Sequence, residues 1–435
     1  MSRVESLVDV TVKIGSGATP RGGNKAYKTE GISLIRSQNV HDFKFLKKGL
    51  AFIDNDQAEL LNNVTVQEND ILLNITGDSI ARACMVPEEI LPARVNQHVA
   101  IIRCEDKKDA YYVLCYLQFL KKHLLTICKV GGTRNALTKE AIQKLLISFV
   151  ENHRKKANLI DLINSKIELN NRINTELESM AKLLYDYWFV QFDFPDENGK
   201  PYKSSGGKMV FNQDLKREIP VGWEVGFLGS ILKTSLGGTP STKNKQYWEN
   251  GEFQWLNSGE IANFPIITSE LKITKDAIIN SATKLMPKGT VTLSITRHIR
   301  PSILAIDACA NQSVVGVYET EKIKSSYSYP LICNEVPKYM SLRTGAQQPH
   351  INKQTVDKTL MILPSKEILD KYYELANPTY EKININAFQN KELVGLRDWL
   401  LPMLMNGQVT VKEAEAKLSN LAMVAEPAGE YKTNQ

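Results

Sequence analysis

Apolar residues recur at alternating steps of three and four along residues 152–189. This segment contains no Pro and no Gly, and it is longer than an ordinary globular helix. The spacing predicts a long helix that pairs through a heptad seam. A long amphipathic helix lying on one globular core would produce the same spacing, so the pattern alone does not identify a partner. The seam positions are Ile160, Ile163, Ile167, Asn170, Asn174, Leu177, Ala181, Leu184 and Trp188.

Sequence found before this helix recurs after it. The loop Gly17-Ala-Thr-Pro20 has a counterpart 220 residues later at Gly237-Gly-Thr-Pro240. The apolar run 71–76 matches 291–296 at the same offset, and Asn96-Gln97 matches Asn311-Gln312 at a slightly smaller one. One unit of about 150 residues therefore occurs twice.

The repeat includes the long helix. At an offset of 216 residues, Asn170 and Asn174 match Asn386 and Asn390. A buried Asn in a seam fixes the register of a helix pair because it needs a polar partner across the seam. Exposed Asn residues on a frayed stripe are the alternative, but both positions recur in both copies. We therefore expect the two helices to pair antiparallel through Ile163, Ile167, Asn170, Asn174, Leu177, Ile383, Asn386, Asn390 and Leu393.

The segments that precede each long helix predict a mixture of strands and short helices. Runs such as 32–36 and 97–103 alternate or are β-branched, whereas 111–125 is apolar at helical spacing. We expect an α+β fold: two similar mixed α/β domains separated by a pair of long antiparallel coiled-coil helices, with internal pseudo-twofold symmetry. The expected parts are a first domain (1–150), a central long helix (151–190), a linker or exposed hairpin (191–222), a second domain (223–363), a C-terminal long helix (364–406) and a polar tail (407–435).

Composition is that of a folded chain and excludes several classes of protein. Hydrophobic residues make up 43% of the 435 residues, and no apolar run has the length of a membrane span. The six cysteines are scattered and lack CxxC spacing, which favours reduced thiols in a cytoplasmic protein. Net charge is +6, so nucleic acid is a permitted partner but not an implied one.

Motifs for catalysis are missing from the sequence. Neither a phosphate-binding loop of the P-loop type, nor HExxH, nor GxSxG occurs, and the histidines do not cluster at metal-ligand spacing. Asn377-Pro-Thr-Tyr380 is similar to the loop with which adenine methyltransferases hold a flipped base, but its third residue differs. We interpret it as a helix start, with Asn as the cap and Pro next. We expect no catalytic residue, no metal site and no cofactor in this chain.

Basic and amide side chains recur around the turns of both copies. Arg and Asn or Gln match the edges of guanine and adenine, and Lys suits phosphates. Each residue alone could be a solvated loop residue, but together they favour a DNA contact by two modules. The candidates are Arg21, Asn24, Lys25, Arg36, Gln38, Asn39, Arg82, Arg134, Asn135, Lys243, Asn244, Lys245, Arg297, His298, Arg300, Arg343, Gln347 and Gln348.

In its order of motifs the chain resembles the specificity subunit of type I restriction-modification enzymes. The resemblance rests on the two Gly-Thr-Pro loops, the two long helices, the segment Tyr185–Phe194 and the end Arg397–Gly407. Two departures are Ala18 in the first loop, where a second Gly is usual, and a turn at 132–134 that lacks glutamine.

This resemblance implies that each repeat is a target-recognition domain that reads one half of a split double-stranded DNA sequence. It implies that the helices set the gap and dock two methyltransferase subunits, and that restriction subunits add translocation and cleavage. S-adenosylmethionine, ATP and Mg would then belong to partner subunits. A protein-binding scaffold with two interaction domains on a helical rod, without a DNA role, is the alternative.

Overall fold

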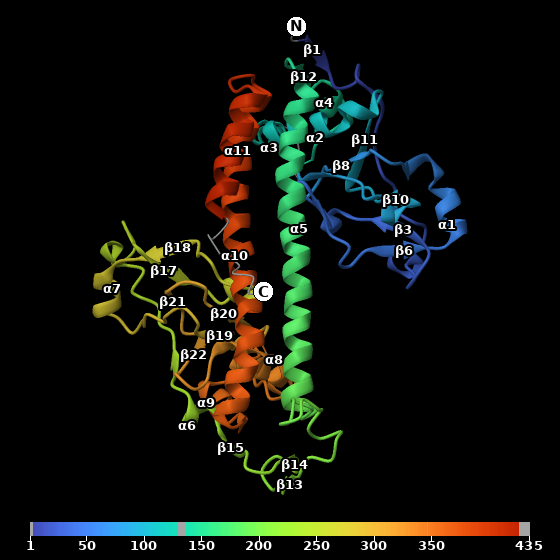
Figure 1. The fold of residues 1–435 in the computed structure, drawn as a ribbon. Helices are drawn as coiled ribbons and strands as arrows, with labels where there is room; N and C mark the ends of the chain where they lie inside the picture. Colours follow the sequence, from blue (N-terminus) through green and yellow to red (C-terminus); the bar gives the residue numbers. More distant parts are fainter. Residues whose placement is uncertain (1–2, 129–135, 346, 426–435) are drawn as a thin grey trace, which may run out of the picture. The chain divides into compact units, whose positions relative to one another are not determined.

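The computed structural model describes residues 3–128, 136–345 and 347–425, which form two compact units. The first unit comprises residues 1–168 and 391–435, and the second comprises residues 169–390. Each unit contains a duplicated type of α/β domain together with part of both long helices, α5 (His153–Tyr185) and α10 (Lys366–Met405) (Figure 1). The expected α+β class with two similar domains is therefore confirmed.

A four-stranded antiparallel sheet forms the centre of the first unit. Its order is β2 (Thr11–Ser16), β11 (Val99–Cys104), β8 (Ile71–Asn74) and β9 (Ala83–Met85). A second four-stranded sheet has the order β6 (Ala51–Ile53), β3 (Ile32–Ile35), β10 (Ala93–Val95) and β7 (Thr65–Val66), with β3 and β10 parallel. Two-stranded pairs are formed by β1 (Arg3–Ser6) with β12 (Leu146–Phe149) and by β4 (Val40–His41) with β5 (Lys44–Phe45).

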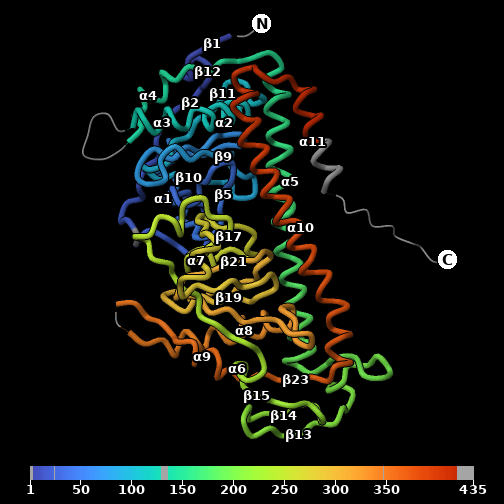
Figure 2. The backbone as a smooth tube through the Cα atoms, turned by 90° about the vertical axis from the view of Figure 1, so that its left-hand side faces the viewer, coloured from blue at the N-terminus to red at the C-terminus, as the bar shows by residue number. Residues whose placement is uncertain are grey.

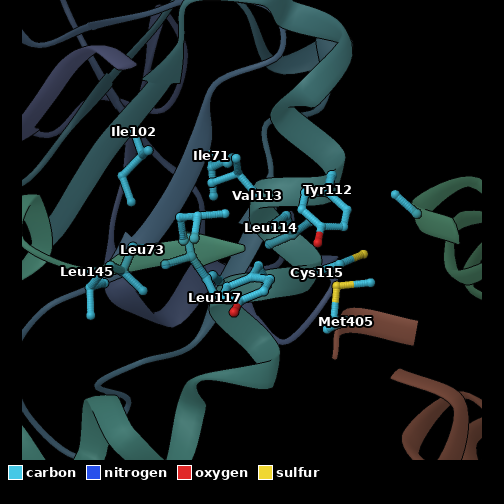
Figure 3. Close-up of a cluster of buried hydrophobic side chains, with 14 of the residues drawn as sticks. Ile71, Leu73, Ile102, Tyr112, Val113, Leu114, Cys115, Leu117, Leu145 and Met405 are labelled. Atoms are coloured by element: carbon cyan, nitrogen blue, oxygen red, sulfur yellow. The ribbon is translucent and has the colours of Figure 1, made fainter. Parts of the chain in front are cut away.

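Alternation along the central strands places side chains on two cores. Ile71 and Leu73 enter the cluster shared with the helices, whereas Leu72 between them packs against the second sheet. Figure 3 shows Ile71, Leu73 and Ile102 beside side chains of the helix that covers this face, with Met405 nearby. Because β8 is buried on both faces, its first three residues, Ile71–Leu73, are all apolar. The helices of this unit are α1 (Asn55–Leu60), α2 (Ala110–Phe119), α3 (Lys121–Ile127), α4 (Lys139–Gln143) and α11 (Val411–Ala425).

The second unit repeats this strand order. Its four-stranded sheet runs β16 (Thr234–Leu236), β22 (Val314–Val317), β19 (Val291–Ser294) and β20 (Arg300–Ile303). Its other sheet is β18 (Leu271–Ile273), β17 (Phe253–Leu256) and β21 (Ala308–Ala310), again with one parallel pair. The remaining elements are the pairs β13 (Met209–Asn212) with β14 (Arg217–Pro220) and β15 (Glu224–Phe227) with β23 (Leu360–Leu363), and the helices α6 (Leu228–Ile231), α7 (Lys275–Ile279), α8 (Ser325–Ser341) and α9 (Lys353–Asp357).

Within the second unit, α5 and α10 pair antiparallel through the Asn residues of the seam. Asn170 is buried and donates to the side-chain oxygen of Asn390 at 2.9 Å, and Asn386 donates to the side-chain oxygen of Asn174 at 2.8 Å. Asn174 in turn donates to the main-chain carbonyl of Ile383 at 3.1 Å. Since each amide has a partner across the seam, a shift of either helix would leave buried polar groups unpaired.

Within the first unit, the start of α5 and the end of α10 also pair antiparallel. Arg397 donates to the side-chain oxygen of Asn164 at 3.0 Å. Ile160, Ile163, Leu400 and Leu404 are buried in one cluster with the α/β domain. Figure 2 shows α5 and α10 as adjacent helices in a second view.

Two expectations about the C-terminal part are wrong. Asn377 does not start a helix, because α10 begins at Lys366 and runs on through Pro378. Residues 407–435 are not all a tail, because Val411–Ala425 form α11. Thr410 and Glu413 cap this helix reciprocally, with the Glu413 carboxylate accepting from the Thr410 main-chain N–H at 2.8 Å. The Thr-x-x-Glu signal was present in the sequence, but Gly407 just before it suggested an end to helical structure.

The expected linker contains the hairpin β13–β14, and its flanks are packed into the second unit. Phe192, Phe194 and Trp223 are buried in the core of that unit. Among the described residues, no helix is long and apolar enough to cross a membrane.

Candidate nucleic-acid interface

In the second unit, four chain segments meet at one end of the sheet β16-β22-β19-β20. The register places Leu236 opposite Val315 and Ser294 opposite both Val314 and Arg300. The loops that leave the strands here are 237–240, 295–299 and 311–313. A fourth segment joins them because Ile351 donates to the carbonyl of Ile295 at 3.0 Å. Loops far apart in the sequence therefore share one end of the sheet.

The Gly-Gly-Thr-Pro loop lies directly against the Asn311-Gln312 loop. A Cβ atom on Gly237 would lie 2.3 Å from the carbonyl oxygen of Ala310, so only glycine allows this approach. Two indole N–H groups fix the loop: Trp255 donates to the main-chain carbonyl of Gly238 at 3.0 Å, and Trp248 donates to that of Ser241 at 3.2 Å. The Thr239 hydroxyl then donates to the side-chain oxygen of Gln312 at 2.5 Å.

Arg297 has an unusual backbone conformation in this cluster. Its φ is +56°, in the left-handed region that costs an L-residue about 1 kcal/mol or more. The loop is fixed by two contacts, from the Arg297 N–H to the carbonyl of Pro349 at 2.8 Å and from Arg343 to the carbonyl of Arg297 at 2.7 Å. The corresponding residue of the first unit is Gly77, with φ +75°. Because glycine would fit without strain, the side chain of Arg297 is retained at an energetic cost.

The predicted residues of the second unit are mostly exposed around this end. Lys243 and Lys245 are exposed, and Asn244 caps the short turn Lys245–Tyr247 by accepting from the main-chain N–H of Gln246 at 3.2 Å. Arg343 differs from the others, since it donates to the carbonyls of Met340 and Arg297 and so positions the loop. The exposed candidates here are Lys243, Lys245, Arg297, His298, Arg300, Gln347 and Gln348.

The equivalent end of the first unit has the same construction. Gly17 approaches so closely that a Cβ atom would lie 2.1 Å from the carbonyl oxygen of Val95. The Thr19 hydroxyl donates to Gln97 at 2.5 Å, as Thr239 does to Gln312 in the other unit. Arg21 and Lys25 are exposed in the continuation of this loop, and Arg82 is half-buried in the loop between β8 and β9. Asn24 lies in a short 3-10 turn, Gly23–Ala26.

One candidate of the first unit is wrong. Asn39 is fully buried, accepts from the Arg36 N–H at 3.0 Å and donates to the Leu46 carbonyl at 2.8 Å. Its amide is thus used inside the fold and is unavailable to a ligand. Arg36 and Gln38 both donate to the carbonyl of Gly49, at 2.6 Å and 2.8 Å, and Gln38 is exposed. Arg134 and Asn135 lie outside the described residues.

The Thr–Gln pairs were missed as candidates. Their signal was present, because Asn96-Gln97 and Asn311-Gln312 recur at matching places in the two copies. Residue type alone favoured the charged neighbours, whereas the pairing of Gln with a Thr far away in sequence is visible only in the fold.

A family model described as the type I restriction modification DNA specificity domain matches residues 5–179 and 220–393. The two matches together cover more than half of the chain and coincide with the two copies of the repeat. The chain belongs to this family. It therefore carries two specificity domains, each with the sheet end described above.

Individual relatives agree with this assignment. The chain is 27% identical over 268 residues to the MjaIX specificity subunit of Methanocaldococcus jannaschii, covering 60% of each protein. It is 23% identical over 332 residues to the HindI specificity subunit of Haemophilus influenzae, covering 64% of this chain and 72% of that protein. The S subunit of a type I restriction-modification system from M. genitalium has a similar fold, with a TM-score of 0.55 at 12% identity over 93% of this chain and 96% of that one.

Proposed function

We propose that this chain is a non-catalytic DNA sequence-recognition subunit of a type I restriction-modification complex. Each specificity domain contacts one half of a bipartite target in double-stranded DNA. The paired helices α5 and α10 set the gap between the halves and dock two methyltransferase subunits, and restriction subunits join the complex as translocase and endonuclease.

The observation that carries this proposal is the repeated sheet end. In both units, exposed basic side chains follow the Gly-Thr-Pro loop, with Arg21 and Lys25 in one and Lys243 and Lys245 in the other. Cations suit phosphates, while the planar Arg group suits base edges, so such an end provides both kinds of DNA contact.

Arg297 is our leading candidate for a base contact. Its exposed guanidinium stands on a left-handed residue braced by Arg343. These contacts fix the backbone of Arg297, and its planar guanidinium can bond two acceptors of a guanine edge. In the first unit Gly77 has no side chain at this place, so the two domains differ where sequence reading is expected.

An exposed apolar stripe on α5 and the turn that follows supports the partner proposal. Met180, Leu183, Tyr187 and Val190 lie at helical spacing, and Leu183 is 69% exposed. Apolar side chains at this spacing on one helix face suit a helix or groove of another protein. We assign this stripe to methyltransferase docking.

The cofactors of the proposed complex are assigned to its other subunits. Among the described residues, no group of three or more His, Cys, Asp or Glu side chains could hold a metal ion. We propose that S-adenosylmethionine, ATP and Mg are bound by the methyltransferase and restriction subunits.

A salt titration of DNA binding tests the recognition role. The chain, assembled with its methyltransferase subunits, should lose affinity for duplex DNA by at least about a hundredfold between 50 and 200 mM salt, because phosphate contacts release counterions. A flat response, or no binding by the assembled complex, would instead favour a protein-binding scaffold. Methyl transfer by the purified chain alone would contradict the non-catalytic assignment.

Substitution within the stripe tests the docking surface. Leu183→Glu should reduce co-purification of the methyltransferase subunits by about tenfold, because a charge enters an apolar contact. Thr175→Glu, an exposed residue of α5 outside the stripe, is the matched control and should leave assembly unchanged. Equal effects of both variants would contradict the assignment of the stripe.

A further inference from the structure

The two Thr–Gln pairs have one geometry in two domains that differ elsewhere. Thr19 donates to Gln97 at 2.5 Å, and Thr239 donates to Gln312 at 2.5 Å. Both Gln residues are exposed, and both pairs lie at the sheet end that also carries the basic loops. In each domain a glycine without room for a Cβ atom brings the two loops together, Gly17 in one and Gly237 in the other.

The pairing determines which end of the amide faces outward. When a Thr hydroxyl donates to the amide oxygen of Gln, the other polar atom of that side chain is the amide nitrogen, which can only donate hydrogen bonds. In Gln312 the hydrogen bond from Thr239 is to the oxygen, and the nitrogen has no hydrogen-bond partner among the described residues. In the first domain the nitrogen of Gln97 also contacts the ring nitrogen Nε2 of His98 at 3.0 Å, which occupies one of its two N–H groups. Each pair therefore presents at least one oriented N–H donor to the outside.

Stability alone gives a weak reason to duplicate an exposed side-chain pair. A hydrogen bond between exposed neutral groups contributes about 1 kcal/mol or less. By contrast, an oriented N–H donor beside cationic side chains matches the oxygens of a phosphodiester, which accept hydrogen bonds in every sequence.

Comparison of the two domains indicates whether these Gln side chains contact DNA bases or the DNA backbone. Domains that read different half-sites need different base contacts, as the replacement of Gly77 by Arg297 illustrates. What all half-sites share is the phosphodiester backbone. We propose that Gln97 and Gln312, oriented by Thr19 and Thr239, each donate a hydrogen bond to a DNA phosphate and so set the position of their domain on the duplex. This inference rests on the proposed DNA-recognition function.

Gln312→Glu separates a phosphate contact from a structural tie. The carboxylate keeps the shape of the side chain and still accepts from Thr239, so the two loops stay joined. The outward donor becomes an anionic acceptor, which repels phosphate. Gln246→Glu adds the same charge at an exposed position of the neighbouring loop and serves as the matched control.

Binding is measured with the full chain assembled with its methyltransferase subunits. The probes are a duplex that contains the target, located by mapping methylated adenines, and a duplex with both half-sites scrambled. We expect Gln312→Glu to weaken binding to both duplexes by a similar factor of about ten, and Gln246→Glu by much less. Gln97→Glu should behave like Gln312→Glu.

Three outcomes would overturn the inference while leaving the proposed function intact. They are unchanged binding of Gln312→Glu, a loss confined to the target duplex, which would indicate a base contact, and an equal loss in Gln246→Glu. Failure of the unsubstituted complex to bind either duplex would instead refute the proposed function. Thr239→Val adds a further check: it frees the amide without removing it and should cause a smaller loss than Gln312→Glu.

Discussion

The two specificity domains have the same framework and different contact loops. Both central sheets have equivalent strand orders, and in both a glycine closes the Thr-Pro loop onto the Asn-Gln loop. One residue in the loops that follow β8 and β19 differs. Gly77 has no side chain, whereas Arg297, whose φ is +56°, carries a guanidinium. The comparison teaches that close backbone approaches constrain the loop-closing glycines in both domains, whereas an exposed position such as Arg297 differs between them.

The domains also differ in how α5 is attached to each. In the first unit, Arg154 and His153 at the start of α5 bind the carboxylate of Asp109, at 2.6 Å and 2.9 Å. In the second unit, the aromatic rings of Tyr185 and Phe189 pack on Tyr327, with centroids 5.5 Å and 4.8 Å away. Charged groups hold the start of α5 in addition to its apolar core contacts, whereas aromatic packing holds its other end, so the two ends should respond differently to pH.

The largest effect is expected from the shared framework. Gly237→Ala places a methyl group 2.3 Å from a main-chain oxygen and should destabilise the second unit by about 3 kcal/mol. Gly17→Ala should do the same in the first unit. Gly395→Ala in α10 meets no atom within 4 Å and should slightly stabilise its helix. Hydrogen exchange resolved by unit measures these changes, and tolerance of either loop substitution would show that the close approach is not required.

A smaller effect is expected where the domains differ. Arg297→Gly gives the second domain the residue of the first, so it should relieve left-handed strain and raise the stability of that unit by about 1 kcal/mol. The same substitution should lower discrimination at one half-site by about tenfold, because one base contact is lost. Thermal unfolding and binding to half-site variants measure the two effects. Loss of both stability and binding would mean that Arg297 is a structural residue.

The smallest effect concerns the two attachments of α5. Burial would raise the pKa of Asp109, but hydrogen bonds from Arg154 and His153 outweigh it and lower this pKa below its usual range. A depressed carboxyl pKa contributes stability that is present above the unfolded-state pKa, about 4, and is lost as pH falls through the folded-state value. We therefore expect the free energy of unfolding of the first unit to fall by about 1 kcal/mol relative to that of the second between pH 6 and pH 3. The expected loss is no larger because Arg154 is partly exposed, and solvent weakens its ion pair with Asp109.

Asp109→Asn should remove this difference in pH response. Hydrogen exchange at the two pH values, followed separately in each unit, provides the measurement. An unchanged pH response in the variant would show that the pair does not hold α5 to the first unit.

Much of the fold could be predicted from particular residues. The heptad spacing and the recurring Asn pairs indicated two long antiparallel helices, because a seam pattern is a local property of the sequence. Thr138 and Asn352, which are typical helix-capping residue types, cap the short helices α4 and α9. The repeated Gly-Thr-Pro loops indicated duplicated domains, which the strand orders confirm.

The parts that could not be predicted depend on contacts between distant segments. Whether Asn39 faces outward is decided by a carbonyl at Leu46 and not by its own neighbours. The role of Arg343 depends on a loop 46 residues away. Asn377-Pro378 has the local signature of a helix start, but packing overrides it: Asn377 accepts from Ser326 at 2.7 Å in the middle of α10. Residue type identified candidate DNA contacts, but only the fold distinguishes exposed donors from residues such as Asn39 and Arg343, whose side chains hydrogen-bond within the protein.

The central claim is that each domain reads its own half-site while the helices set the gap. Its most direct test is to replace residues 1–150 with the first domain of another member of the family and to map methylated adenines in genomic DNA. We predict that one half of the recognised sequence changes, while the other half and the gap between them stay the same. A change in both halves, or in neither, would contradict the claim.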